Sequence, residues 1–129
     1  MILYCCNDLL WASKVRSTAD AMGIPARPAR DRAMLLARLD DSPVRGVLLD
    51  LEAAGSGELL ALLRGPAADP RAAPLRVIAF GPHVEAVRLA EAARAGATAV
   101  FARGALVSRL PGVLQALASG ATIAGSLEE

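Results

Sequence analysis

The sequence feature that most constrains the fold is a continuous apolar run, Val47, Leu48 and Leu49, which ends abruptly at Asp50. A run without polar alternation is typical of a strand that is buried on both faces of a parallel sheet. In open α/β sheets, groups at the carboxyl ends of central strands lie in the crevice where ligands bind. Asp50 is therefore the first candidate site residue. The alternative is that Asp50 only opens a polar loop or caps a turn.

Short strand-like segments alternate with segments of helical periodicity along the whole chain. The expected strands are residues 2–6, 24–29, 47–50, 75–80 and 98–102. This alternation predicts a parallel sheet with right-handed crossovers and helices on both faces. We expect one doubly wound α/β domain, a (βα)5 unit over residues 1–118, followed by a C-terminal tail, residues 119–129. Two prolines, Pro25 and Pro28, place the second strand at an edge of the sheet.

The helix boundaries are predicted from capping residues and from the apolar period. The second helix is expected to be capped by Asp31 and the third by Ser56, since both side chains can accept a hydrogen bond from a free backbone N–H group. The last helix is expected to begin near Ser108, which would place Pro111 in its first turn, where proline is tolerated.

Charge and hydropathy exclude several classes of function. The net charge is +1, with both signs interspersed, so no nucleic-acid partner is expected. No apolar run approaches the roughly 20 residues that span a bilayer, and the first residues lack a basic signal-peptide region. We therefore expect a cytoplasmic protein without a membrane partner. Cys5 and Cys6 are adjacent and are the only cysteines, which predicts small buried apolar side chains rather than a disulfide framework.

Two stretches of the sequence resemble the receiver domain of two-component response regulators. One is Val47-Leu48-Leu49-Asp50 followed by Glu58-Leu59-Leu60, and the other is residues 92–101 with the turn Ala95-Gly96-Ala97. The resemblance extends from Ile2 to Leu117. It implies a flavodoxin-like, five-stranded parallel sheet of order 2-1-3-4-5 and a role in phosphorelay signal transduction.

The resemblance also implies a set of functional positions. In the family, an aspartate after the third strand accepts a phosphoryl group, and an acid pair after the first strand helps it to bind Mg²⁺ through carboxylate oxygens. Asp50 matches the phospho-acceptor position. The acid-pair positions fall on Cys6 and Asn7, and a shift of one residue would use Asn7 and Asp8 instead, which leaves a single acid.

The remaining family positions are also altered. A hydroxyl after the fourth strand and a lysine after the fifth hold the phosphoryl oxygens in the family, because the charge that develops in phosphoryl transfer must be neutralised. These two switch positions fall on Gly81 and Arg103, and the usual next proline is Gly104. An arginine keeps the charge and offers a bidentate partner to Asp50. The loop after Asp50 is about two residues shorter than usual.

These departures favour a degenerate receiver, or pseudo-receiver, that has no enzymatic activity or cofactor and acts by binding a protein. The alternative is a working receiver that is phosphorylated on Asp50 and binds Mg²⁺ through Asp8, Asp50 and the Glu52 carbonyl. A third possibility, a small α/β enzyme or nucleotide binder, ranks last, because the sequence contains neither a phosphate-loop pattern nor a nucleophile–base pair.

The resemblance places the partner contact on the fourth helix, the fifth strand and the fifth helix. In this chain that face would present Arg88, Glu91, Arg103 and Arg109. The partner is expected to be another protein or a second copy of this chain.

Overall fold

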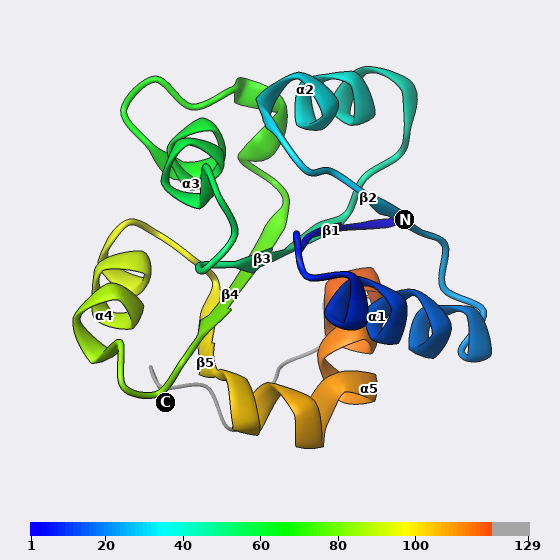
Figure 1. Cartoon of the computed structure of the whole chain (residues 1–129). Coiled ribbons are helices and arrows are strands. Elements are labelled where there is room, and N and C mark those ends of the chain that lie inside the picture. The colour runs from blue at the N-terminus through cyan, green and yellow to red at the C-terminus, as the bar shows by residue number, and fades with distance from the viewer. Residues whose placement is uncertain (120–129) are drawn as a thin grey trace.

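The computed structural model of the chain describes residues 1–119, which form one five-stranded parallel sheet with helices on both sides (Figure 1). The strands are β1 (Ile2–Cys5), β2 (Ala26–Pro28), β3 (Gly46–Asp50), β4 (Arg76–Gly81) and β5 (Ala99–Ala102). The helices are α1 (Leu9–Ala21), α2 (Arg32–Asp41), α3 (Ser56–Arg64), the 3-10 helix η1 (Pro70–Ala72), α4 (Ala86–Arg94) and α5 (Arg103–Ser119). The strand order is β2-β1-β3-β4-β5, which confirms the predicted order and the edge position of β2.

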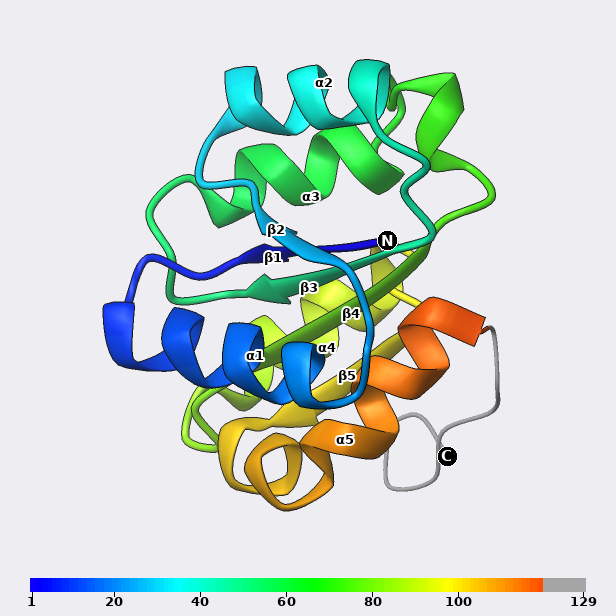
Figure 2. The ribbon, with the colours of Figure 1, turned by 90° about the vertical axis from the view of Figure 1, so that its right-hand side faces the viewer.

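The sheet separates two apolar cores, because successive strand residues point to opposite faces. Helices α1 and α5 cover one face, and α2, α3 and α4 cover the other (Figure 1). Figure 2 shows α2 and α3 on one side of the sheet and α1 and α5 on the other. All four aromatic residues of the chain pack on the α1/α5 side, namely Tyr4, Trp11, Phe80 and Phe101. The opposite core is built from aliphatic side chains such as Leu35 and Leu59. We refer to these as the aromatic face and the aliphatic face.

The predicted cap of α2 is confirmed, and the predicted cap of α3 is wrong. The Asp31 side chain accepts a hydrogen bond from the Met34 N–H at 2.8 Å. The residue that precedes α3 is Gly55, with a left-handed backbone at φ 79°, a conformation that glycine adopts without strain. Ser56 is already inside the helix, and its buried hydroxyl donates to the Leu51 carbonyl at 2.9 Å. Ser56 therefore fastens the loop after Asp50 instead of capping α3.

The predicted start of α5 is also wrong. The helix begins at Arg103, directly after β5, and not near Ser108. Pro111 consequently lies inside the helix and not in its first turn. An interior proline removes one backbone hydrogen bond and costs about 3 kcal/mol or more. The early start buries Leu106 and Leu110 against the sheet, which offsets that cost.

A close contact joins the end of α5 to the start of β3. A Cβ atom on Gly46 would lie 2.8 Å from Leu117 Cδ2 and 2.9 Å from the Leu117 carbonyl oxygen. Only glycine permits this approach, because real Cβ atoms do not come so near to backbone oxygen. The contact therefore fixes where α5 ends relative to the sheet.

Within residues 1–119, no helix combines the length and the apolar character that crossing a membrane requires. Ser119, which was expected to open the tail, is the last residue of α5. The rest of the predicted tail lies outside the described residues.

Candidate functional site

The candidate site lies at the carboxyl edge of the sheet, where β1, β3 and β5 end. Cys5 pairs with Leu49 in the parallel register of β1 and β3, so the next residues, Cys6 and Asp50, are neighbours. Arg103 follows the last residue of β5. Because side chains alternate along strands, Cys6, Asp50 and Arg103 all lie on the aromatic face. The prediction that Asp50 ends a buried central strand is confirmed.

Asp50 is almost completely buried, with 2% of its surface exposed. Its Oδ1 accepts a hydrogen bond from the Glu52 N–H at 2.9 Å and lies 3.8 Å from Arg103 Nη2. Burial raises the pKa of Asp50, while the Glu52 N–H and the Arg103 guanidinium act in the opposite direction. The carboxylate is thus desolvated and has a cation beside it.

Arg103 makes contacts with several other residues of the site. Its Nη2 also forms an ion pair with Glu52 Oε1. Its guanidinium carbon lies 5.8 Å from the centroid of the Trp11 ring, a cation–π distance. Trp11 is in turn tilted against Phe80, with ring centroids 5.3 Å apart. One side chain therefore links the end of β3, the loop after it and the start of α1.

One atom of Arg103 has no polar contact. Its Nε is buried and has no hydrogen-bond partner among the described residues. A buried donor without a partner costs about 1–3 kcal/mol. The ion pair with Glu52 and the contact with Trp11 stabilise this orientation despite that cost.

The two residues predicted to take the family's acid positions, Cys6 and Asn7, carry no carboxylate. Cys6 is buried, and its pKa is raised to about 12, mainly by burial and further by the nearby carboxylates of Asp50 and Asp8. The thiol is therefore neutral at physiological pH. Asn7, the second of these residues, is exposed. The prediction that both cysteines are buried is confirmed.

The nearest acid, Asp8, has a structural role at the start of α1. Its Oδ1 accepts hydrogen bonds from the Leu10 N–H at 2.9 Å and from the Trp11 N–H at 3.3 Å. This is the usual work of an N-cap residue, which satisfies backbone donors that have no partner in the helix. The cap also fixes the position of Trp11, three residues further on.

The donor set does not fit Mg²⁺. This hard cation takes oxygen ligands, and carboxylates above all. The position beside Asp50 offers a neutral thiol instead, and the Arg103 guanidinium lies 3.8 Å from the Asp50 carboxylate. No group of three or more histidine, cysteine, aspartate or glutamate side chains within residues 1–119 is placed to hold a metal ion.

Gly81 lies at the carboxyl end of β4 and, as a glycine, contributes no side chain to this group. A Cβ atom built on Gly81 would lie 3.6 Å from Leu51 Cβ and 3.5 Å from Leu89 Cδ2, both residues of the aliphatic face. Gly81 and Arg103 thus lie on opposite faces of the sheet. The Gly81 backbone is not in the left-handed region, so the position accepts a larger residue without backbone strain.

The residues of the predicted partner face differ in exposure. Arg88, Glu91 and Arg109 are exposed on α4 and α5. Arg103 is instead turned toward Asp50 and Glu52, with 35% of its side chain exposed. Sequence reasoning assigned Trp11 no part in the site. The one sequence feature that could have indicated a role for Trp11 is Asp8, because this N-cap residue places the first turn of α1 at the carboxyl edge of the sheet.

Several solved structures share this fold. The receiver domain of NtrX from Brucella abortus is 22% identical, with a TM-score of 0.76 over 94% of this chain and 100% of that chain. A longer NtrX structure from the same organism is 22% identical, with a TM-score of 0.75 over 92% of this chain but 26% of that chain. A response regulator from Thermotoga maritima is 14% identical, with a TM-score of 0.72 over 92% of this chain and 96% of that chain.

No protein-family model matches the sequence, and no curated protein gives a significant match. The comparisons therefore establish the fold of this chain. The chain has the flavodoxin-like fold of response-regulator receiver domains.

Proposed function

We propose that this chain is a receiver-like signalling module that acts in the cytoplasm by binding a protein partner, without the Mg²⁺-dependent phosphorylation cycle. The observation that carries the proposal is the place of Arg103. Its guanidinium lies 3.8 Å from Asp50 Oδ1, beside a neutral Cys6 thiol, where a phosphorylated receiver needs a second carboxylate and a metal ion.

The chemistry of phosphoryl transfer supports the proposal. The transferred group carries charge on its outer oxygens, and catalysis consists of positioning it and neutralising that charge. This chain keeps a cation at Arg103 but has neither an acid pair for a dication nor a hydroxyl at Gly81. The carboxylate of Asp50 is 2% exposed and has Arg103 beside it, so it is a poor nucleophile for a phosphodonor.

The proposed partner surface is the exposed side of α4 and α5, which carries Arg88, Glu91 and Arg109. The partner is a protein with complementary charges or a second copy of this chain. The group formed by Arg103, Glu52 and Trp11 holds the start of α5 in one position. The partner surface therefore takes its binding conformation without a phosphoryl group.

The test is intact-mass spectrometry after incubation with acetyl phosphate and millimolar Mg²⁺. We expect no gain of a phosphoryl mass in the natural chain. The control is a receiver domain that retains both acids, which shows that the reagent is active. A gain that disappears in Asp50→Asn would overturn the proposal and identify Asp50 as a working phospho-acceptor.

A restored variant makes the same test sharper. It combines Cys6→Asp, Asn7→Asp, Gly81→Thr and Arg103→Lys, and a Cβ at Gly81 meets its neighbours only at ordinary contact distances. We expect this variant to gain a phosphoryl group that depends on both Mg²⁺ and Asp50. A restored variant that folds but stays unmodified would show that the short loop, rather than the missing side chains, blocks the reaction.

A further inference from the structure

A groove runs along one side of α1, beside the segment that follows β2. Its volume of about 310 Å³ is at the lower end of the range for small-molecule sites. Helix α1 lines it with residues three and four positions apart, from Leu9 to Asp20, and Tyr4 and Arg30 come from other segments. None of the residues assigned to the Asp50 site lines this groove. A ligand bound here is therefore independent of the function proposed above.

The polar side chains of the groove are mainly hydrogen-bond donors. Two of them are guanidinium groups, Arg16 and Arg30, and hydroxyl groups come from Tyr4, Ser13 and Ser17. Guanidinium groups carry their charge at every physiological pH and present several N–H donors in a fixed plane. This set of groups matches an anion with several acceptor oxygens.

Arg16 is held in position by two contacts. Its guanidinium forms a hydrogen bond with the Tyr4 hydroxyl, and this bond, together with the charge of Asp20, raises the pKa of Arg16. Tyr4 is 4% exposed and its ring packs in the core of the aromatic face, so the hydroxyl is firmly placed. Asp20 lies one turn further along α1, with its Oδ2 3.5 Å from Arg16 Nε. Arg16 is therefore oriented in advance, although it is exposed.

Arg30 supplies a second cation that no carboxylate neutralises. It is exposed, and its guanidinium has no ion-pair partner among residues 1–119. Its backbone N–H donates to Met34 Sδ at 3.4 Å, which ties this segment to the first turn of α2. The side chains that line the groove thus carry two positive charges and one negative charge, that of Asp20. The excess of positive charge favours an anionic ligand.

We propose that this groove binds a small phosphate monoester, with the phosphate group between Arg16 and Arg30. A phosphate group offers three terminal oxygens and can accept from two guanidinium groups and a hydroxyl at once. A carboxylate has two oxygens, which a single guanidinium already satisfies. The ligand competes with Asp20 for Arg16, and the contact between these two residues shows that an anionic group fits there. Leu9 and Ala12 line the space that is left for the organic part.

The test is amide NMR on the full ¹⁵N-labelled chain, titrated with glycerol phosphate at constant ionic strength. We expect saturable shifts of the amides of Ser13, Ser17 and Arg30. Arg30→Gln should weaken binding about tenfold, the effect of losing a charged hydrogen bond. Asp20→Asn should strengthen binding roughly two- to fivefold, because it removes the competing partner of an exposed ion pair.

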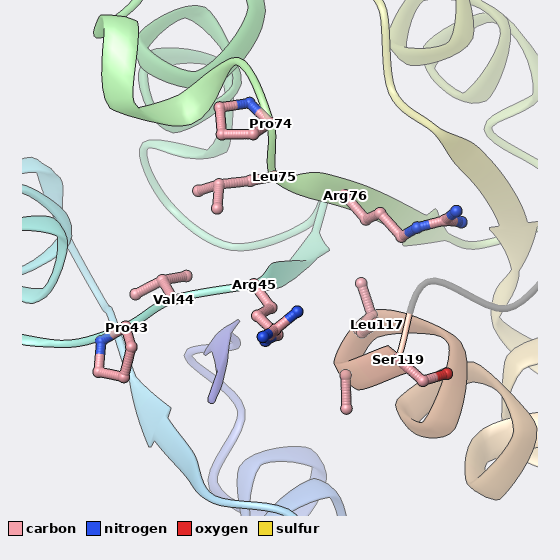
Figure 3. Close-up of a pocket in the computed structure, with 9 residues that line it drawn as sticks. Pro43, Val44, Arg45, Pro74, Leu75, Arg76, Leu117 and Ser119 are labelled. Carbon is pink, nitrogen blue, oxygen red and sulfur yellow. The ribbon is translucent and has the colours of Figure 1, made fainter.

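Two variants serve as matched controls. Arg45→Gln removes the same charge from a different groove, at the amino-terminal edge of the sheet (Figure 3), and Arg103→Met removes the cation of the Asp50 site. Neither should change the affinity. Equal weakening in Arg45→Gln would overturn the proposal, because binding would then be non-specific, and so would loss of binding in Arg103→Met, because the ligand would then lie beside Asp50.

Two further outcomes would also overturn the proposal. Shifts that do not saturate would show that there is no site, and weaker binding in Asp20→Asn would show that this carboxylate does not compete with the ligand. The same titration with inorganic phosphate tests the organic part of the ligand. We expect several-fold weaker binding, whereas equal affinity would identify a site for the phosphate ion alone and exclude the monoester as its specific ligand.

Discussion

The two faces of the sheet differ in composition and in what they support. The aliphatic face packs α2, α3 and α4 with leucine, valine and alanine, and its role is to hold those helices on the sheet. The aromatic face packs α1 and α5 and holds every aromatic ring of the chain together with the candidate site. An arginine beside a desolvated carboxylate needs surroundings that stabilise its charge, and an aromatic ring does so through its negative π face. The comparison indicates that the aromatic rings serve the site as well as the core.

The largest expected effect is the loss of stability when a large buried side chain on either face is replaced by alanine. Phe80→Ala should lower the free energy of unfolding by about 3–5 kcal/mol, since it opens a cavity and also removes the ring against Trp11, which is worth about 0.5–1.5 kcal/mol beyond its area. Leu59→Ala on the aliphatic face is the comparison, at about 2–5 kcal/mol. Urea denaturation measures both free energies, and Trp11 fluorescence of the folded state should change only in Phe80→Ala. An equal change in both variants would show that the faces are not distinct.

A smaller loss of stability is expected when Arg103, which links the site to the aromatic face, is replaced. Arg103→Met keeps the aliphatic stem but removes the charge that lies near Asp50, Glu52 and Trp11. The loss should be about 1–2 kcal/mol of unfolding free energy, the sum of an exposed ion pair and a cation–π contact. Thermal and urea denaturation measure it. Arg88→Met, an exposed residue of α4, is the matched control and should change stability little; a similar loss there would contradict the assigned role of Arg103.

The smallest effect concerns the pH dependence of stability. Burial raises the pKa of Asp50 in the folded state, so the folded state binds the proton more tightly than the unfolded state does. The stability from this carboxyl is therefore fully present below its unfolded pKa and is lost as pH rises through its folded pKa. Asp50→Asn should accordingly be more stable than the natural chain at pH 7, and the difference should close on acidification.

Asp69 provides a control of opposite sign. Hydrogen bonds from Arg71 lower the pKa of Asp69 to about 2, so its stabilising contribution is present at neutral pH and is lost as the pH falls toward that value. Asp69→Asn should therefore destabilise the protein at pH 7. The measurement for both variants is the urea midpoint between pH 3 and pH 7. If Asp50→Asn and Asp69→Asn change stability in the same direction at pH 7, the assigned burial of Asp50 is wrong.

By itself the sequence determined the architecture. The spacing of short apolar runs and helical segments predicted the (βα)5 sheet, and the run that ends at Asp50 predicted a central buried strand with its carboxylate at the carboxyl edge. These features are local, because periodicity, glycines, prolines and capping residues act within a few positions of one another. The resemblance then assigned the altered positions Cys6, Gly81 and Arg103.

Only the tertiary structure decided how those positions are used. Arg103 contacts Glu52 and Trp11, which are 51 and 92 positions away in the sequence, so no local pattern predicts either contact. The predicted start of α5 is wrong because Gly104 and Pro111 locally disfavour a helix, whereas the burial of Leu106 and Leu110 makes the helix favourable. The Gly46–Leu117 contact likewise joins the start of β3 to the end of α5, which are 71 positions apart in the sequence. In each case packing between distant segments outweighs local preference, because buried apolar area contributes more free energy than helix propensity does.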